Sequence, residues 1–392
     1  MGRTTPREAI PQSADELTAE WFTDVLAERI DQATVTAVRT EIIGAGIGFV
    51  GELHRCQLTW DRDDARLPSS VVAKMPSALR KNRAMGEGLL AYEREILVYR
   101  DLAGRLGIAM PDHIHSAMDP NPAPWLERIV VFLFERLPLG GINWTVDQLM
   151  KLARKSERRF LLVIEDIDDA QPPSQVEEGS LEDVQSALGV LADFHAANWQ
   201  PTELVAENPF LWPLNRTPKV VQAGYKRYRE SFVARFGEMV ESEFLRRMDE
   251  LQAQLPELVD RLVAGPSCLL HGDYRLDNIM FRPSGDMVVL DYQLVGYGRP
   301  GWDVAYFITT ALSPEHRGAE RELLEHYHAA LVDAGVTDHS FDELAADVRL
   351  TKELLAHRLI GTGDLIDTAI ADHDDSFIDL LVRRTTGWVD LD

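Results

Sequence analysis

The sequence predicts a mixed α+β protein of two lobes, a β-rich N-terminal lobe and a mainly helical C-terminal lobe. Short runs of β-branched and aromatic residues, separated by Gly, Pro, Asp and Ser, mark the first part of the chain. Long amphipathic helical patterns dominate beyond about residue 180. The stretch between them, 165–173, is acidic and ends in two prolines, so we divide the chain there into 1–165 and 166–392.

The composition excludes two classes of partner. Lys plus Arg number 40 and Asp plus Glu number 64 among 392 residues, which gives a formal net charge of −24. Nucleic acids and anionic membranes both require a basic surface, so we expect neither as a partner. A chain of this length can bury a large core, and we expect it to be a monomer or a homodimer.

The sequence is typical of a soluble cytoplasmic protein. Cys56 and Cys268 lie in apolar surroundings, which predicts buried, reduced thiols and a reducing compartment. Residues 1–12 lack the apolar core of a signal peptide. The longest apolar run, Ile129–Phe134, is too short to span a bilayer.

The N-terminal lobe is predicted to open with a helix, because Ser13 and Glu16 have the spacing of a capping box. Strands are expected at Val35–Ile43, Glu52–Trp60, Ser70–Met75, Ile129–Phe134 and Phe160–Ile164. Residues 84–106 are predicted to form one long helix, since one apolar stripe runs through Leu89, Tyr92, Ile96, Tyr99 and Leu102. Segment 136–159 is polar and basic, and we interpret it as an insertion.

The C-terminal lobe is predicted to be helical apart from a β-hairpin near 279–291. Its expected helices are 181–198, 218–264, 316–335, 341–360 and 376–387.

A glycine-rich stretch with Gly44, Gly46 and Gly48 lies between the first two strands. Without a Cβ, glycine lets the backbone approach a phosphate closely. A dinucleotide-binding fold would need a helix directly after the glycines, whereas the strand-like run Glu52–Trp60 follows. Strand, glycine turn, strand and then a strand carrying Lys74 is the order typical of a kinase glycine loop. A purely structural hairpin turn is the alternative.

Lys74 is interpreted as a point charge for the phosphates of ATP, held by a carboxylate of the following helix. Glu93 and Glu95 are both candidates for that carboxylate. Glu95 is preferred because it lies three residues after Tyr92 and four before Tyr99, at the edge of the buried stripe. A solvated lysine at a strand end is the alternative.

The most informative segment begins at His271-Gly-Asp273, which follows a short apolar strand. Asn278 comes five residues after Asp273. A turn at 283–286 is predicted to reverse two short strands, and Asn278 and Asp291 lie equally far from its midpoint. The hairpin should therefore return an amide oxygen and a carboxylate to the same end, which suits Mg²⁺.

These residue types meet the needs of phosphoryl transfer, which are positioning and charge neutralisation. Asp273 would accept or orient the proton of a substrate hydroxyl. Asn278 and Asp291 would hold the metal ions that bridge the phosphates of ATP, and Lys74 would steady the α- and β-phosphates. An Asp or Asn in a loop is more often only a turn former, but four such parts in the right order favour the chemical interpretation.

These segments resemble the aminoglycoside phosphotransferase superfamily, which includes the choline kinases, and most closely its ecdysteroid-kinase-like (CHK-like) branch. The resemblance runs from about residue 40 to 310. It rests on His271-Gly-Asp273 with Asn278, Asp291-Tyr-Gln, Gly301-Trp-Asp303-Val-Ala-Tyr-Phe, Leu162-Val-Ile-Glu165-Asp-Ile, Leu191-Ala-Asp-Phe-His195-Ala and Ala91-Tyr-Glu-Arg-Glu95.

The resemblance implies a bilobal, protein-kinase-like fold that uses ATP and Mg²⁺. It implies that Glu165 to Ile167 form the hinge whose backbone binds adenine. It also implies a supporting role for Asp303, which would bond the backbone of the catalytic loop. Segment 136–159 departs from the shorter connection that the superfamily leads us to expect.

We therefore expect a phosphotransferase that moves the γ-phosphoryl group of ATP to an alcohol group of a small hydroxylated substrate, with Asp273 as base. A catalytically silent nucleotide-binding pseudokinase is the alternative, although such proteins commonly lose a metal or base position. A protein kinase fits less well, because no Ala-Pro-Glu follows Asp291. His195 and His271 are expected to pack and hydrogen-bond only. The sequence identifies neither the acceptor nor a preference between ATP and GTP.

Overall fold

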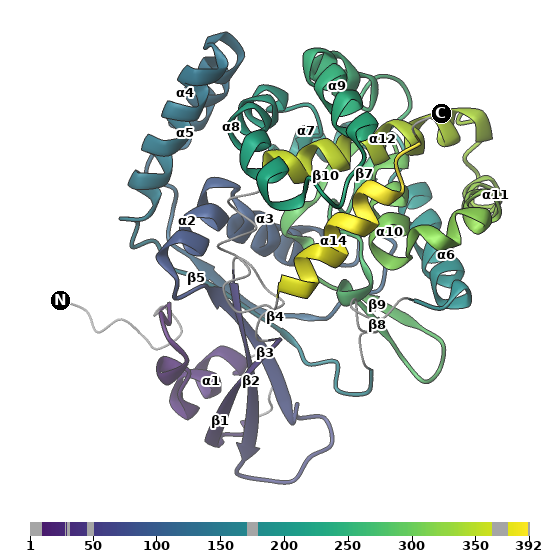
Figure 1. Cartoon of the computed structure of the whole chain (residues 1–392). Coiled ribbons are helices and arrows are strands. Elements are labelled where there is room, and N and C mark those ends of the chain that lie inside the picture. The colour runs from purple at the N-terminus through teal and green to yellow at the C-terminus, as the bar shows by residue number, and fades with distance from the viewer. Residues whose placement is uncertain are drawn as a thin grey trace. The chain divides into compact units, whose positions relative to one another are not determined.

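The computed structural model describes residues 10–27, 29, 32–44, 51–170, 179–362 and 375–390 (Figure 1). The chain forms two compact units. The first comprises Met1–Ala103, Met110–Pro122 and Gln148–Asp168, and the second comprises Gly104–Ala109, Ala123–Asp147 and Asp169–Asp392. The last passage between the units, after Asp168, lies within the acidic stretch 165–173. Two segments that precede this stretch, 104–109 and 123–147, belong to the second unit.

The first unit is built on a five-stranded antiparallel sheet of order β1-β2-β3-β5-β4 (Figure 1). Its strands are β1 (Val35–Ile43), β2 (Gly51–Trp60), β3 (Ser70–Pro76), β4 (His113–Met118) and β5 (Phe160–Glu165). Four of these strands are those predicted. β4 was not predicted, because all six of its residues are half-buried and its sequence shows no alternation of apolar and polar residues.

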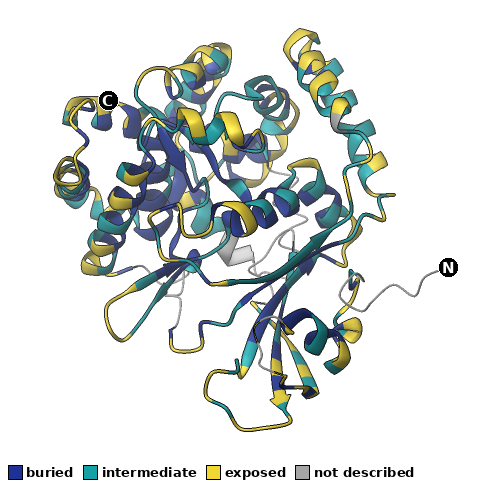
Figure 2. Ribbon diagram, turned by 180° about the vertical axis from the view of Figure 1, so that it is seen from behind, coloured by how far each residue is buried: buried dark blue, intermediate teal, exposed yellow. Residues whose placement is uncertain are grey.

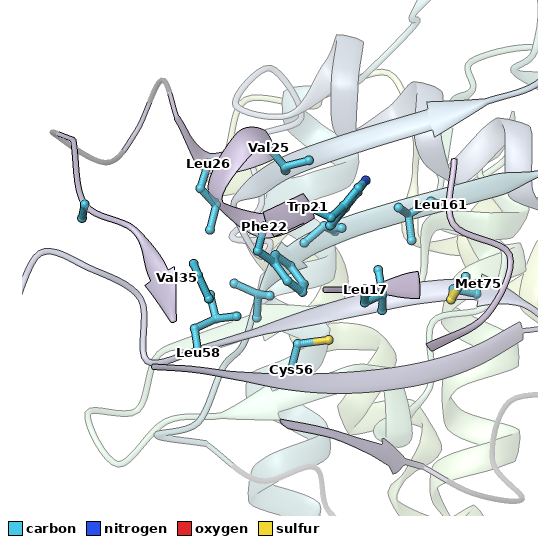
Figure 3. Packing of buried hydrophobic residues seen from close by; sticks show 14 residues of the cluster. Leu17, Trp21, Phe22, Val25, Leu26, Val35, Cys56, Leu58, Met75 and Leu161 are labelled. Atoms are coloured by element: carbon cyan, nitrogen blue, oxygen red, sulfur yellow. The ribbon is translucent and has the colours of Figure 1, made fainter. Parts of the chain in front are cut away.

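One face of this sheet is covered by α1 (Ala19–Leu26). Figure 3 shows Trp21 and Phe22 of this helix packed with Cys56 of β2 and Leu161 of β5. Both cysteines, Cys56 and Cys268, are free and buried, as predicted. Burial raises the pKa of the Cys56 thiol to about 12, so this side chain packs as a small apolar group.

The predicted capping box at the N-terminus is wrong. The side chain of Ser13 makes no capping hydrogen bond, and Ala14–Glu16 form only a short 3-10 turn, η2. The α-helix begins after Thr18, whose hydroxyl accepts the N–H of Trp21 at 3.2 Å. Thr18 therefore caps the helix by pairing with one of the N–H groups of its first turn, the role that we predicted for Ser13.

The predicted helix 84–106 is broken into three pieces. These are α2 (Arg80–Gly88), α3 (Ala91–Leu97) and the π-helical turn η3 (Val98–Leu102). The break falls at Leu90, which has φ of +53°. Gly86 and Gly88 precede it and are weak helix formers. The stripe from Tyr92 onward is buried as predicted, whereas Leu89 is exposed.

The prediction of a strand at Ile129–Phe134 is also wrong, because this run lies inside α4 (Pro124–Arg136). A continuous apolar run has no period that separates a strand from a helix. Pro124 in the first turn and the length of the segment favour the helix. The interpreted insertion, 136–159, contains a second helix, α5 (Leu139–Ala153).

The second unit is mainly helical. Its helices are α6 (Leu181–Ala197), α7 (Thr202–Glu207), α8 (Pro218–Phe236), α9 (Ser242–Arg261), α10 (Gly301–Ala311), α11 (Glu320–Asp333), α12 (Phe341–Gly361) and α14 (Asp375–Gly387). The predicted helix 218–264 is therefore two helices, α8 and α9. Most of α10 and much of α12 are buried, and these two helices pack together in the core of the unit (Figure 2).

Short strands support the loops of the second unit. The strands of one sheet, in the order β6-β10-β7, are β6 (Trp212–Pro213), β10 (Gly296–Gly298) and β7 (Cys268–Leu270). The predicted hairpin is present as β8 (Ile279–Phe281) and β9 (Met287–Val289). The short helical turns are η4 (Leu276–Asn278), η5 (Tyr292–Leu294) and η6 (Pro314–Ala319). Among the described residues, no helix is both long and apolar enough to cross a membrane.

Candidate active site

A buried ion pair joins β3 to α3 in the first unit. The Nζ atom of Lys74 lies 2.8 Å from Oε1 of Glu95, and the two side chains are 11% and 4% exposed. The prediction that Glu95, and not Glu93, holds Lys74 is confirmed. Glu93 instead binds Arg158. Because water hardly reaches the pair, the carboxylate holds the ammonium group in a set position.

The alternation of side chains along β3 explains where Lys74 points. Val71, Ala73 and Met75 belong to the core beneath α1. Successive side chains of a strand point to opposite faces, so Lys74 is turned away from that core. The strand therefore delivers its one cation to the face on which Glu95 of α3 lies.

The glycine turn has the predicted strand order. β1, β2 and β3 are consecutive antiparallel neighbours, and Lys74 lies on the third of them. Gly44 follows β1 with φ of +62°, a conformation that favours glycine. Gly46 and Gly48 lie outside the described residues.

The segment after β5 is anchored through its middle residue. Asp166 accepts hydrogen bonds from Nε of Arg55 at 2.7 Å and from the hydroxyl of Ser70 at 2.6 Å. The N–H of Glu165 donates to a carbonyl group in the chain ahead of β4. Within the described part of the chain, the N–H of Ile167 has no hydrogen-bond partner, so it remains able to bind a ligand.

The loop that carries Asp273 follows β7 in the second unit. Gly272 has φ of +81°, and a Cβ at this position would lie 2.3 Å from the carbonyl oxygen of Leu294. Both the conformation and the lack of space require glycine before Asp273. The loop then closes with the turn η4, which ends at Asn278.

The backbone of this loop is held by Asp303, in the first turn of α10. Its carboxylate accepts the N–H of His271 at 2.6 Å and the N–H of Gly272 at 3.0 Å. It also accepts Nε2–H of His195 at 3.3 Å. A carboxylate that is 0% exposed is stable only when such donors replace water. The supporting role expected for Asp303 is confirmed.

The two buried histidines complete this network. His271 donates from Nε2 to the carbonyl of Leu290 at 2.9 Å and accepts the N–H of Asp273 on Nδ1 at 3.3 Å. His195 accepts the hydroxyl of Tyr327 on Nδ1 at 2.7 Å. Burial raises the pKa of Tyr327, which keeps its hydroxyl a donor. Both histidines pack and hydrogen-bond, as predicted.

The carboxylate of Asp273 is held on both of its oxygens. The hydroxyl of Tyr306 donates to Oδ1 at 2.6 Å, and Nδ2 of Asn278 donates to Oδ2 at 3.2 Å. Nε of Arg275 lies 3.5 Å from Oδ2. Burial, and then the charge of Asp273, raise the pKa of Tyr306, so this hydroxyl stays protonated. With 18% of its side chain exposed, Asp273 is both held in place and accessible.

The hairpin brings Asn278 and Asp291 to the same end, as predicted, but with a different register. Ile279 pairs with Val289, and the N–H of Leu290 donates to the carbonyl of Asn278 at 2.8 Å. Asn278 therefore lies opposite Leu290, and Asp291 follows one residue later. Asp291 has φ of +64°, which is unusual for a residue with a side chain and often marks a functional turn.

The oxygens at this end of the hairpin fit a hard cation. Nδ2 of Asn278 donates to the backbone carbonyl of Asp273 at 2.9 Å as well as to its carboxylate. The amide nitrogen is thus occupied, and Oδ1 of Asn278 can serve as an oxygen ligand at the end of the hairpin where Asp291 also lies. The described residues include no group of three or more His, Cys, Asp and Glu side chains placed to hold a metal ion. Two oxygen ligands suit Mg²⁺, which usually retains water or phosphate oxygens as its other ligands.

Residues 45–337 match the Ecdysteroid kinase-like family, and this match spans well over half of the chain. The chain belongs to the ecdysteroid kinase-like family. The resemblance predicted from the motifs is therefore confirmed, and the family match contains the ion pair of Lys74 and the loop of Asp273.

Solved structures agree on the fold of this family member. Choline kinase from Cryptosporidium parvum Iowa II has a TM-score of 0.53 and 13% identity, over 94% of this chain and 93% of that chain. Plasmodium vivax ethanolamine kinase has a TM-score of 0.52 and 11% identity, over 96% of this chain and 88% of that chain. At these identities the likeness concerns the fold alone, and it confirms the predicted kinase-like α+β class.

One curated protein shares a shorter stretch of sequence with this family member. Acyl-CoA dehydrogenase family member 10 of Mus musculus is 34% identical over 119 residues. The match covers 30% of this chain and 10% of that much longer protein.

Sequence reasoning missed two residues that contact Asp273. Tyr306 lies three residues after Asp303 on α10, and Arg275 lies two residues after Asp273. The helical spacing of Asp303 and Tyr306 was a usable signal, because residues three apart share a face of a helix. Neither residue type stands out in an apolar helix or a polar loop, so the structure was needed to find them.

We predict that Asp303→Asn lowers the free energy of unfolding by about 2–3 kcal/mol. An amide offers one acceptor oxygen, and its NH₂ group would face a backbone N–H that then lacks a partner. Urea unfolding measures the effect. Asp193→Asn, at an exposed position of α6, is the control and should change the free energy of unfolding by less than about 0.5 kcal/mol. Equal stability of the two variants would contradict the role of Asp303.

Proposed function

We propose that this chain is an ATP-dependent small-molecule kinase that transfers the γ-phosphoryl group to an alcohol hydroxyl of its substrate. The observation that carries the proposal is the placement of Asp273. Its accessible carboxylate is held on both oxygens, and Asp303 holds the backbone of the loop that bears it. Membership of the ecdysteroid kinase-like family and the fold shared with choline kinase support the same conclusion.

Residues of the first unit would bind the nucleotide. The ammonium group of Lys74, held by Glu95, would lie against the α- and β-phosphates. The turn with Gly44, Gly46 and Gly48 would bring backbone N–H groups to the phosphates. The backbone of Glu165 to Ile167 would bind adenine. The N–H of Ile167, which has no hydrogen-bond partner among the described residues, supports this assignment.

Asn278 and Asp291 would hold Mg²⁺ through one amide oxygen and one carboxylate. The bound ion would neutralise the charge of the phosphates. Asn278 would have two tasks, because its Nδ2 holds Asp273 and its Oδ1 would bind the cation. The side chain of Asn278 would thus fix the position of Asp273 relative to the metal-binding end of the hairpin.

Asp273 would act on the acceptor. The acceptor hydroxyl would give its proton to the carboxylate as its oxygen bonds to the γ-phosphorus, and the bond from that phosphorus to ADP would break. Arg275 would provide positive charge close to the reacting groups. The contribution of the protein is then mostly one of positioning, as phosphoryl transfer requires.

The function is tested with MgATP and a library of hydroxylated compounds, by mass spectrometry for the addition of a phosphate. We expect the wild type to phosphorylate at least one compound and Asp273→Ala to lower kcat by about 10²- to 10⁴-fold. Asp286→Ala, in the exposed turn of the same hairpin, should retain kcat. Full activity of Asp273→Ala would refute the mechanism. A wild type that binds MgATP but phosphorylates nothing would favour the silent nucleotide-binding alternative.

A matched pair of variants tests the role of the Lys74 ion pair. Glu95→Gln removes the partner of Lys74, whereas Glu93→Gln removes the partner of Arg158 and leaves Lys74 in place. We expect Glu95→Gln to lower kcat/KM for MgATP by about tenfold or more, because a loosened ammonium group binds the phosphates poorly. Glu93→Gln should change kcat/KM for MgATP by less than about threefold. The same loss in both variants would assign Glu95 a structural role only.

A further inference from the structure

The carboxylate of an aspartate turns easily, because rotation about χ2 has broad and nearly twofold minima. A general base that meets its substrate at a constant angle must therefore be held by partners. Asn278 donates to Oδ2 of Asp273 at 3.2 Å. Among the described residues, Tyr306 supplies the hydrogen bond to Oδ1, and at 2.6 Å this bond is the shorter of the two.

Tyr306 reaches Asp273 from the helix that also holds the backbone of the loop. Asp303 and Tyr306 lie three residues apart, so they project from the same side of α10. Asp303 binds the N–H groups of His271 and Gly272, and Tyr306 binds the side chain of Asp273. One helix face thus fixes three successive residues, two through the backbone and one through its carboxylate.

The surroundings of Tyr306 separate this role from simple packing. Ten of the eleven residues of α10 are buried, and Tyr306 is the exception. This buried helix therefore has one side chain that is only partly buried, and the hydroxyl of that side chain donates to Asp273. Phenylalanine would fill the same space, so the hydroxyl is the part of the residue that packing does not explain.

We propose that Tyr306 is a positioning residue for phosphoryl transfer, whose hydroxyl fixes the orientation of the Asp273 carboxylate toward the acceptor hydroxyl. This inference rests on the proposed function. Because Tyr306 acts on the base and not on the nucleotide, its loss lowers kcat and leaves the affinity for MgATP unchanged.

The test compares Tyr306→Phe with Tyr225→Phe. Tyr225 is a matched control, because its hydroxyl donates to Oδ1 of another aspartate, Asp249 on α9, at 2.8 Å. The probe is MgATP, with water as acceptor and with each compound that the wild type phosphorylates. Tyr306→Phe is expected to lower kcat about tenfold, the effect of one hydrogen bond to a charged group, with the Kd of MgATP unchanged. Tyr225→Phe is expected to keep kcat within about twofold.

Thermal unfolding of both variants shows whether each is folded at the assay temperature. Equal kcat values in the two variants overturn the inference. A higher Kd of MgATP in Tyr306→Phe with unchanged kcat also overturns it, because the residue then acts on the nucleotide. An inactive wild type overturns the proposed function and the inference together, whereas an active wild type with an equally active Tyr306→Phe overturns the inference alone. Partial recovery of kcat in Tyr306→His, which keeps a donor, supports it.

Discussion

The candidate site depends on the carboxylate of Asp303, which is 0% exposed and holds the N–H groups of His271 and Gly272. The loop they begin has little regular structure of its own, and Gly272 gives it conformational freedom. The hydrogen bonds to the buried carboxylate restrict the loop to one backbone conformation. The direction in which Asp273 leaves the loop follows from these two bonds.

The position of Asp303 depends in turn on helix packing. α10 lies against α12, and a Cβ at Gly301 would lie 2.6 Å from Cβ of Asp347. Because Gly301 has no Cβ, α10 and α12 can approach each other closely, and this contact fixes the position of α10. The apolar residues of α10 bury that helix in the core, so Asp303 and Tyr306 meet the loop in a set place. The geometry of Asp273 thus depends on the core packing of the second unit.

Residues with a clear local pattern could be predicted from the sequence. The choice of Glu95 over Glu93 followed from helical spacing, and the shared end of Asn278 and Asp291 followed from the hairpin turn. The apolar run 129–134 was misread because it has no period, and the break at Leu90 was missed because the apolar stripe continues beyond it. The helical spacing of Tyr306 from Asp303 placed both on one face of α10, but the role of Tyr306 depends on contact with a residue 33 positions away, which the spacing does not show.

The most direct test of the central claim, that Asp303 holds the loop of Asp273 rigid, is amide hydrogen exchange at His271 and Gly272. Because both N–H groups are hydrogen-bonded to a buried carboxylate, the account predicts protection comparable to that of the core residues of α10. Exchange as fast as that of the exposed hairpin turn at 283–286 would contradict it, since the loop would then be free to move and Asp273 would have no set direction.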